Sequence, residues 1–246
     1  MMKMVLSRIV FLMFALFSLL SFTTEGDLVY RIKKIDKEIK VDANWNKDIW
    51  KNIDALQLKN YMGAKPEHFP TVYAKVAYSD SNLYVIFKVN DQYVRSVAKK
   101  YQDKVFEDSC VEFFFTPDDN SKKGYFNLES NCGGVQLFHY NSLNDQKRVP
   151  IKYEDYQKVT VAHSLPKIND PEIKKKITWY LEYKIPFELI EKYYKMKKPT
   201  AGTEWKGNFY KCGDKTSHPH WLTWNKVEYP TPNFHMPQYF GTLIFE

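Results

Sequence analysis

The 246-residue sequence has the composition of a folded protein. Its 44% hydrophobic, 26% charged and 17% aromatic residues exclude a disordered chain, and nine glycines and twelve prolines are too few for collagen or low-complexity repeats. The formal charge of +7 comes from lysines scattered along the chain rather than gathered in one stripe, so it does not indicate a nucleic-acid partner.

The first 23 residues have the layout of a secretory signal peptide. Two positive charges precede an apolar run over Ile9–Leu20, and small side chains precede a cleavage site after Thr23. The run is shorter than the about 20 apolar residues that span a bilayer, although a retained anchor is the alternative. We therefore expect one domain over residues 24–246 that is secreted, periplasmic or held at the cell surface, with no stable membrane insertion once the leader is cleaved.

Most of this domain alternates apolar and polar residues with period 2, which is typical of β-strands. The pattern is clearest over residues 83–89 and 177–185. Only residues 186–194 carry a clear helical pattern, which begins with a proline. About ten strands and one or two short helices predict an all-β fold, a jelly-roll-like β-sandwich. The other expected strands cover residues 73–78, 109–115, 125–131, 135–140, 159–163, 205–212, 221–224 and 240–245, while 141–156 and 163–175 are expected to be loops.

Three cysteines in a secreted chain raise the question of a disulfide. Cys110 adjoins the apolar run 111–115 and is expected to be a buried thiol. Cys132 and Cys212 each lie where a strand meets a glycine turn, so we predict a bridge between them, with two free thiols as the alternative. The spacing of the cysteines matches no CxxC or zinc-finger pattern.

The sequence contains no serine-hydrolase elbow, zinc-protease helix or phosphate-binding glycine loop. Glu112 and Glu129 are the best candidates for the two carboxylates of a glycoside hydrolase. Alternation places Glu112 with Cys110 and Phe114 on one face of its strand, and Glu129 on the polar face of the next strand. A sheet face that carries paired polar groups explains these acids equally well, so an enzyme remains an alternative.

A polar sheet face beside aromatic loop residues favours carbohydrate binding. Carboxylates and amides form directed hydrogen bonds with sugar hydroxyls, and flat rings cover the apolar faces of a sugar. The candidate rings are Phe106, Trp221, Trp224 and Phe234. For each of them, packing in the core is the competing interpretation.

Several sequence segments also favour carbohydrate binding. Trp45 and Trp50 are followed, in order, by AYSDSNLYV (77–85), EDSCVEFFF (107–115), YFNLESN (125–131) and FHMPQYFG (234–241). From about Ile39 to the C-terminus, this series resembles the family 9 carbohydrate-binding modules and their relatives. The resemblance implies a secreted β-sandwich that clamps a terminal sugar unit between two aromatic rings.

The resemblance also implies which residues bind. The two clamp rings are tryptophans in the family and are matched here by Phe106 and Phe234, and the binding glutamate six residues after the first ring is matched by Glu112. An arginine and an asparagine on the next strand match Asn127 and Glu129, so the arginine is lost. We expect the three polar residues to orient sugar hydroxyls and the two rings to stack on the sugar.

Further expectations follow from the same resemblance. Trp224 is kept as an additional ring. The family often carries structural calcium, for which the turns at Asp80 and 118–119 supply acids; no other cofactor is expected. Related sandwiches bind haem, and in that alternative His235 and Met236 would be the ligands, while a plain adhesion module is a further rival. The expected protein is a non-catalytic binder of carbohydrate in polysaccharide utilisation, acting beside glycan-degrading enzymes.

Overall fold

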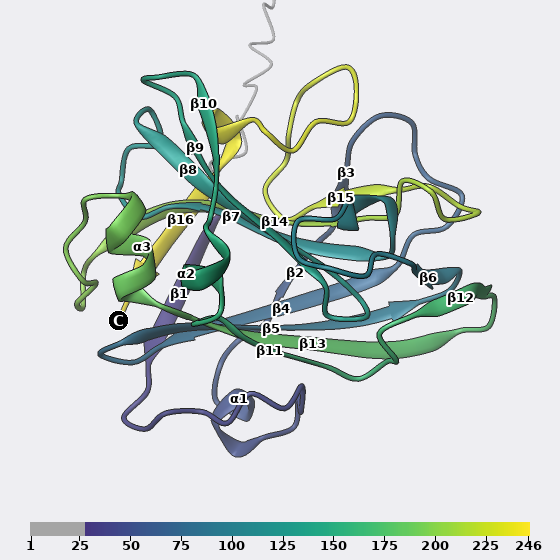
Figure 1. Cartoon of the computed structure of the whole chain (residues 1–246), viewed down its shortest axis with the longest axis horizontal. Helices are drawn as coiled ribbons and strands as arrows, with labels where there is room; N and C mark the ends of the chain where they lie inside the picture. Colours follow the sequence, from purple (N-terminus) through teal and green to yellow (C-terminus); the bar gives the residue numbers. More distant parts are fainter. Residues whose placement is uncertain (1–27) are drawn as a thin grey trace, which may run out of the picture.

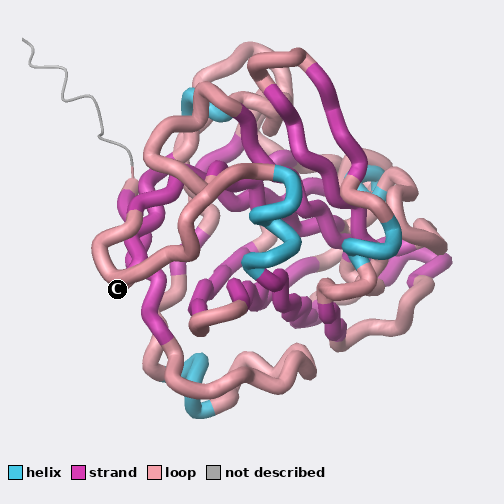
Figure 2. Tube along the Cα trace, turned by 60° about the vertical axis from the view of Figure 1, so that its left-hand side comes forward, coloured by secondary structure: helices cyan, strands magenta, loops and turns pink. Residues whose placement is uncertain are grey.

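The computed structural model describes residues 28–246, and the expected signal peptide, residues 1–23, lies outside this range. Within the described residues, β-strands form two sheets that pack face to face (Figure 1). Figure 2 shows the same dominance of strands, with helices limited to short segments between them. The predicted β-sandwich is therefore confirmed. No helix in residues 28–246 is long and apolar enough to cross a membrane.

The first sheet is the upper layer of Figure 1 and carries the candidate site. Its strand order is β10-β9-β8-β7-β14-β16-β1, and two short strands, β15 and β3, extend it beyond β14. The bounds of these strands are β10 (Lys147–Pro150), β9 (Gln136–Ser142), β8 (Gly124–Asn131), β7 (Cys110–Thr116), β14 (Glu204–Cys212), β16 (Gly241–Phe245), β1 (Val29–Lys34), β15 (Trp221–Thr223) and β3 (Asn60–Tyr61).

The second sheet is the lower layer, and strand β1 connects the two. Residues 29–32 of β1 pair with β16 of the first sheet, and residues 33–34 pair with β4 of the second, in both cases in parallel. The order continues β4-β5-β13-β11, with β2 on β4 and a separate pair β6-β12 at one end. The bounds are β2 (Leu56–Gln57), β4 (Thr71–Tyr78), β5 (Asn82–Asp91), β6 (Val94–Ser96), β11 (Thr160–His163), β12 (Asn169–Ile173) and β13 (Ile177–Pro186).

Helices occupy only short connections. The expected helix after Pro186 forms as α3 (Phe187–Tyr193). Two regions expected to be loops contain regular structure: β10 and α2 (Tyr153–Tyr156) lie in 141–156, and β12 lies in 163–175. The two strands form because these polar segments pair with β9 and β6, which the local sequence pattern does not reveal. The remaining helical turns are α1 (Asp48–Lys51) and the 3-10 turns η1 (Val105–Glu107) and η2 (Pro237–Tyr239).

Alternation along β7 separates the interior of the sandwich from the outer face of the first sheet. Val111, Phe113 and Phe115 pack in the main core between the sheets. Their neighbours Cys110 and Phe114 belong instead to a second apolar cluster on the outer face. This is the division that the period-2 pattern predicts, and it makes the outer face of the first sheet available to a ligand.

The outer face of the second sheet is covered by the N-terminal segment. The indole of Trp50 is fully buried there and packs with Tyr84 and Ile86. Glu182, which is also fully buried, accepts hydrogen bonds from Trp50 Nε1 at 2.9 Å and from Lys47 Nζ at 2.9 Å. In Figure 1, helix α1 lies beyond the second sheet on the side away from the first. The two outer faces therefore differ, because one is sealed by the chain itself and the other carries a cavity.

The predicted disulfide between Cys132 and Cys212 is wrong, since all three cysteines are free, buried thiols. Cys132 packs in the core between the sheets, where its thiol lies 3.7 Å from the carbonyl of Arg95. Cys212 belongs to the outer-face cluster and is the direct cross-strand partner of Cys110. The two glycine turns look alike in sequence, but their thiols point into different clusters.

Candidate functional site

A cavity of about 240 Å³ opens on the outer face of the first sheet, and we call it the outer-face pocket. Its floor comes from β7, β8 and β14, and its walls come from the turn before β7, from β10, and from the loops on either side of β15. The lining residues are the aromatic side chains Phe106, Phe114, Trp221 and Phe234, the polar or charged side chains Glu112, Glu129, Arg148, Cys212, Asp214, Asn233 and His235, and Pro232.

Four predicted site residues meet in this pocket: Phe106, Glu112, Glu129 and Phe234. Glu112 on β7 and Glu129 on β8 are direct cross-strand partners, so their side chains leave the same face side by side. Alternation predicts that both acids leave the same face of the sheet, and the register observed between β7 and β8 brings them side by side.

The carboxyl group of Glu129 is buried, and only one of its two oxygens has a hydrogen-bond partner. Its Oε1 accepts a hydrogen bond of 2.7 Å from Asn127 Nδ2, and Arg148 Nη2 lies 3.8 Å from the same oxygen. Its Oε2 has no hydrogen-bond partner, although the residue is only 3% exposed. Burial raises the pKa of Glu129 to about 7 against the opposing effects of Asn127 and Arg148. An oxygen of this kind is a site for a donor from a ligand.

Glu112, which is equally buried, lies beside the thiol of Cys212. The thiol donates a hydrogen bond of 3.1 Å to Glu112 Oε1. Burial, followed by the neighbouring Cys212 and Glu129, raises the pKa of Glu112 well above its ordinary value. Burial likewise raises the thiol pKa of Cys212, so this sulfur acts as a weak donor in the pocket floor.

Arg148 supplies a positive charge from the edge strand β10. Its Nη2 donates to His235 Nε2 at 3.2 Å, and His235 Nδ1 lies 2.8 Å from the hydroxyl of Tyr125. Because a guanidinium has no acceptor, Nε2 must accept, and the ring proton therefore resides on Nδ1 and is donated to Tyr125. Burial and the charge of Arg148 lower the pKa of His235 to about 4, so this imidazole is neutral at pH 7.

The third carboxyl group of the pocket belongs to Asp214, which follows β14 and binds the indole of Trp221. Its Oδ1 accepts a hydrogen bond of 2.8 Å from Trp221 Nε1. Its backbone N–H donates to the carbonyl of Phe106 at 3.2 Å, which ties the two loops together. Burial raises the pKa of Asp214 above its ordinary value.

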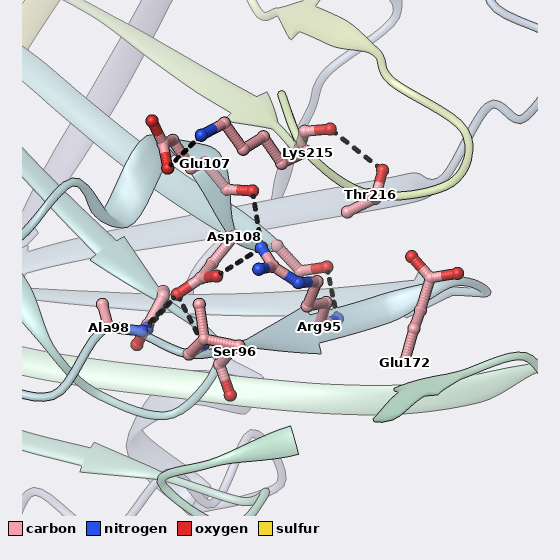
Figure 3. Close-up of polar contacts among 12 residues, drawn as sticks. Arg95, Ser96, Ala98, Glu107, Asp108, Glu172, Lys215 and Thr216 are labelled. Carbon is pink, nitrogen blue, oxygen red and sulfur yellow. Dashed lines mark hydrogen bonds and ion pairs between the residues drawn. The ribbon is translucent and has the colours of Figure 1, made fainter. Parts of the chain in front are cut away.

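The turn that carries Phe106 is anchored by Asp108. Figure 3 shows the Asp108 carboxylate between Arg95 and Ala98, and Glu107 beside Lys215. Asp108 is fully buried and accepts from Arg95 Nη1 at 3.1 Å and from the backbone N–H of Ala98 at 3.0 Å. Lys215 Nζ lies 3.0 Å from Glu107 Oε2. These contacts fix the position of a ring that itself remains half-buried in the pocket lining.

The two predicted clamp rings differ in burial. Phe106 packs only partly against the outer-face cluster. Phe234 is 8% exposed and its ring stacks on that of Tyr210, with centroids 4.2 Å apart and planes inclined by 14°. Phe234 is therefore part of the cluster as well as part of the pocket wall.

Two predicted residues lie outside the pocket lining. Asn127 is fully buried, and its amide is committed to Glu129 on one side and to Asn141 Nδ2, at 2.6 Å, on the other. It therefore positions the glutamate. Trp224 faces the main core, where it packs against Tyr30 and Phe209. A Cβ added to Gly241 would lie 2.7 Å from its ring, so glycine is required there to let the indole pack.

Four charged or polar residues of the lining are not among the predicted site residues. The sequence predicts a loop for Arg148, and Asp214 and Asn233 follow no alternating pattern. His235 is expected only as a ligand in the haem alternative. Trp221, one of the four candidate rings, lines the pocket in place of Trp224. The sequence signal for Trp221 is that it is an aromatic residue in an expected strand, which the structure shows as the start of β15.

Several of the expected metal and haem ligands have partners within the chain. Asp80 pairs with Lys34 at 2.7 Å, and Asp118 pairs with Lys123 at 2.9 Å; calcium at these turns stays a prediction. Within residues 28–246, the one group of three close His, Cys, Asp or Glu ligand atoms is Cys110, Glu112 and Cys212. Two thiols suit a soft metal rather than calcium, which takes oxygen ligands. Both ring nitrogens of His235 have partners, which does not fit a haem ligand.

A family model for carbohydrate-binding family 9 matches residues 39–245. The chain belongs to carbohydrate-binding family 9. This match confirms the resemblance of the sequence segments, and it covers the outer-face pocket and the strands of both sheets other than β1. No curated protein matches the chain.

Solved structures share the fold. A crystal structure of a Bacteroides uniformis protein for which carbohydrate binding has been suggested has 29% sequence identity and a TM-score of 0.80, covering 90% of this chain and 100% of that one. A family 9 carbohydrate-binding module from Caldicellulosiruptor kristjanssonii in complex with cellotriose has 14% identity and a TM-score of 0.61, covering 89% and 94%. The same organism's family 9 module in complex with glucose has 16% identity and a TM-score of 0.60, covering 88% and 95%.

Proposed function

We propose that this protein binds carbohydrate without catalysing a reaction, and that it holds one sugar unit at the end of a glycan in the outer-face pocket. The observation that carries the proposal is the meeting of Phe106, Trp221 and Phe234 with Glu112, Glu129 and Arg148 around one cavity in a family 9 chain. The rings offer apolar surface for the C–H faces of a sugar, and the charged groups offer directed hydrogen bonds for its hydroxyls.

The volume of the pocket supports a single sugar unit. Pockets that take drug-sized ligands run from about 300 to 1,000 Å³, and the outer-face pocket has about 240 Å³. A glycan therefore enters with its terminal residue, and the rest of the chain extends into solvent. The related complexes with cellotriose and glucose support glucose-type units as the first ligands to try.

The placement of the acids favours binding over catalysis. A glycoside hydrolase needs two carboxyl groups that flank the bond to be broken. Glu112 and Glu129 instead are adjacent cross-strand residues of one sheet face, so both approach a ligand from the same side. We expect the protein to be exported by its leader, residues 1–23, and to hold glycans near enzymes that degrade them.

Glycan binding is tested by isothermal titration of the purified domain with glucose, cellotriose and a panel of plant and bacterial oligosaccharides. Phe106→Ala is expected to weaken binding because it removes a half-buried ring from the pocket lining. Phe69→Ala is the matched control, since this exposed ring packs on Tyr61 and does not line the outer-face pocket. Failure of every glycan to bind, or an equal loss with both variants, would contradict the proposal.

A further inference from the structure

The outer-face pocket has a surplus of acid. Three carboxyl groups line it, those of Glu112, Glu129 and Asp214, against the single guanidinium of Arg148. His235 is neutral at pH 7 and adds no charge. Asp214 accepts a hydrogen bond from the indole of Trp221, whereas one carboxyl oxygen of Glu129 accepts none. A positively charged group on a ligand would therefore balance the excess of acidic groups in the lining.

The unpartnered oxygen of Glu129 identifies where that group would bind. Oε2 is buried and accepts no hydrogen bond, whereas Oε1 already accepts from Asn127. A sugar hydroxyl would satisfy the hydrogen bond but would leave Arg148, 3.8 Å from Glu129 Oε1, as the positive charge that faces two buried acids, and keeping two buried carboxylates ionised with too little counter-charge is costly. An ammonium group supplies both the donor and the charge.

The aromatic walls favour the same kind of ligand. Phe106, Trp221 and Phe234 line the pocket together with the two acids. The faces of aromatic rings attract cations, and a site that combines rings with carboxylates is suited to an amine. An uncharged sugar gains from the rings and from hydrogen bonds between its hydroxyls and the acids, whereas an amino sugar gains in addition from the attraction between its ammonium group and the acids.

We propose that the sugar unit held in the outer-face pocket carries a free amino group, and that this ammonium binds between Glu129 and Glu112. The inference rests on the proposed function, because it takes the pocket to hold one sugar unit. It adds the ligand class: glycans that end in an unacetylated amino sugar.

The direct test compares three methyl glycosides that differ at one position: glucosaminide, glucoside and N-acetylglucosaminide. Titration calorimetry with EDTA present is expected to give the glucosaminide about tenfold or greater tightening over the glucoside, as a charge-assisted bond implies. Acetylation should abolish the gain, since it removes the charge. Because the two glutamates bind protons in the free protein, the glucosaminide should also release protons, seen as a dependence of the measured heat on the buffer.

Three variants test which side chains produce the difference between glucosaminide and glucoside affinities. Glu129→Gln should narrow the ratio between glucosaminide and glucoside affinities to near one. Arg148→Gln should widen it, because it removes the competing positive charge; the side chain is half exposed, so folding is not at risk. Glu188→Gln on α3 is the matched control and should leave the ratio unchanged, since Glu188 is exposed and pairs with Lys158. Melting temperatures separate loss of binding from loss of folding.

The outcomes distinguish this inference from the proposed function. Equal affinity for glucosaminide and glucoside would overturn the amino-sugar proposal and leave carbohydrate binding intact. Failure of all three glycosides and of the wider glycan panel would overturn both. Binding of Zn²⁺ or Ca²⁺ alone, with loss of glucosaminide binding when the metal is added, would show that the acids serve a metal and would also overturn the amino-sugar proposal.

Discussion

The ring of Phe234 lies flat on the ring of Tyr210, with 4.2 Å between the centroids and 14° between the planes. The hydroxyl of Tyr210 also donates to the backbone carbonyl of Phe234 at 3.2 Å. The loop before β16 is thus attached to β14 by the same residue that forms a wall of the outer-face pocket. This double contact gives Phe234 a structural role that the partly exposed ring of Phe106 does not share.

The two rings should therefore respond differently to truncation. Phe106→Ala is expected to weaken sugar binding by about 1–3 kcal/mol, by analogy with the stacking of flat rings on aromatic side chains, with little change in melting temperature. Phe234→Ala is expected to weaken binding and also to destabilise the fold by about 3 kcal/mol, toward the lower end of buried phenylalanine truncations. Thermal melts and titration of the two variants check both effects, and equal melting temperatures for the two would contradict the assignment.

The contribution of Glu129 to stability should fall as the pH rises from 6.5 to 8. The folded-state pKa of Glu129, about 7, lies above its ordinary value, so its contribution is complete below about pH 4.5 and is lost as the pH rises through 7; Glu112 acts in the same direction. The lowered pKa values of His139, His220 and His235 act oppositely, because their unfolded forms still lose protons as the pH rises above 6.5. The part due to Glu129 is therefore measured as the difference between the parent and a variant that lacks only this acid.

Glu129→Gln provides the check on this pH dependence. For a shift from 4.5 to about 7, the linked change in unfolding free energy is on the order of 3 kcal/mol in all, of which about 1 kcal/mol falls between pH 6.5 and 8. Urea unfolding at intervals across this window should show that the parent loses more stability with rising pH than Glu129→Gln, and that the exposed control Glu188→Gln behaves like the parent. The same pH dependence for the parent and for Glu129→Gln would show that burial does not hold a proton on Glu129.

All three cysteines should be free and protected in the native protein. Cys110, Cys132 and Cys212 are buried, and burial raises the pKa of each thiol, so alkylating reagents should react slowly. After denaturation without a reductant, mass spectrometry should find three alkylated cysteines. Recovery of one alkylated cysteine and one disulfide-linked peptide would contradict the structure.

The sequence predicted the sheet floor of the site well and its loop walls less completely. Period 2 on β7 and β8 places Glu112 and Glu129 on the outer face, and antiparallel pairing of neighbouring strands makes them cross-strand partners. Arg148 could not be placed in this way. It reaches the pocket because β10 pairs at the edge of β9, and that pairing depends on backbone hydrogen bonds between polar segments.

The C-terminal tryptophans show the same limit. Trp221 and Trp224 are three residues apart, and no alternation across the short β15 distinguishes the ring that faces the pocket from the ring that faces the core. The distinction depends on contacts made at long range in the sequence. Asp214 binds the indole of Trp221, and Gly241 leaves room for Trp224. Local pattern therefore predicts which segments form the site, while tertiary contacts decide which side chain of a segment enters it.

A buried ion pair lies on the opposite side of β14 from the outer-face pocket. The side chains of Lys211 and Asp91 are both inaccessible to solvent, with Nζ 3.4 Å from Oδ2. Lys211 Nζ also donates to His220 Nε2 at 2.7 Å, and Asp91 Oδ1 lies 2.7 Å from His68 Nε2. Because Lys211 precedes Cys212, which lines the pocket, alternation directs the two side chains to opposite faces of the strand.

Breaking this pair from one side should destabilise the fold strongly and leave the pocket intact. Asp91→Leu strands the charge of Lys211 in the interior and is expected to cost about 3–5 kcal/mol. The double variant Asp91→Leu with Lys211→Met removes both charges and should recover part of that loss, because an apolar pair of similar volume needs no counter-charge. Asp80→Asn, which breaks the exposed pair with Lys34, should change stability by less than about 1 kcal/mol.

Urea unfolding of the parent and the three variants measures these differences, and sugar titration of the folded double variant should match the parent. A double variant no more stable than Asp91→Leu alone would show that packing around Asp91, rather than the stranded charge, accounts for the loss.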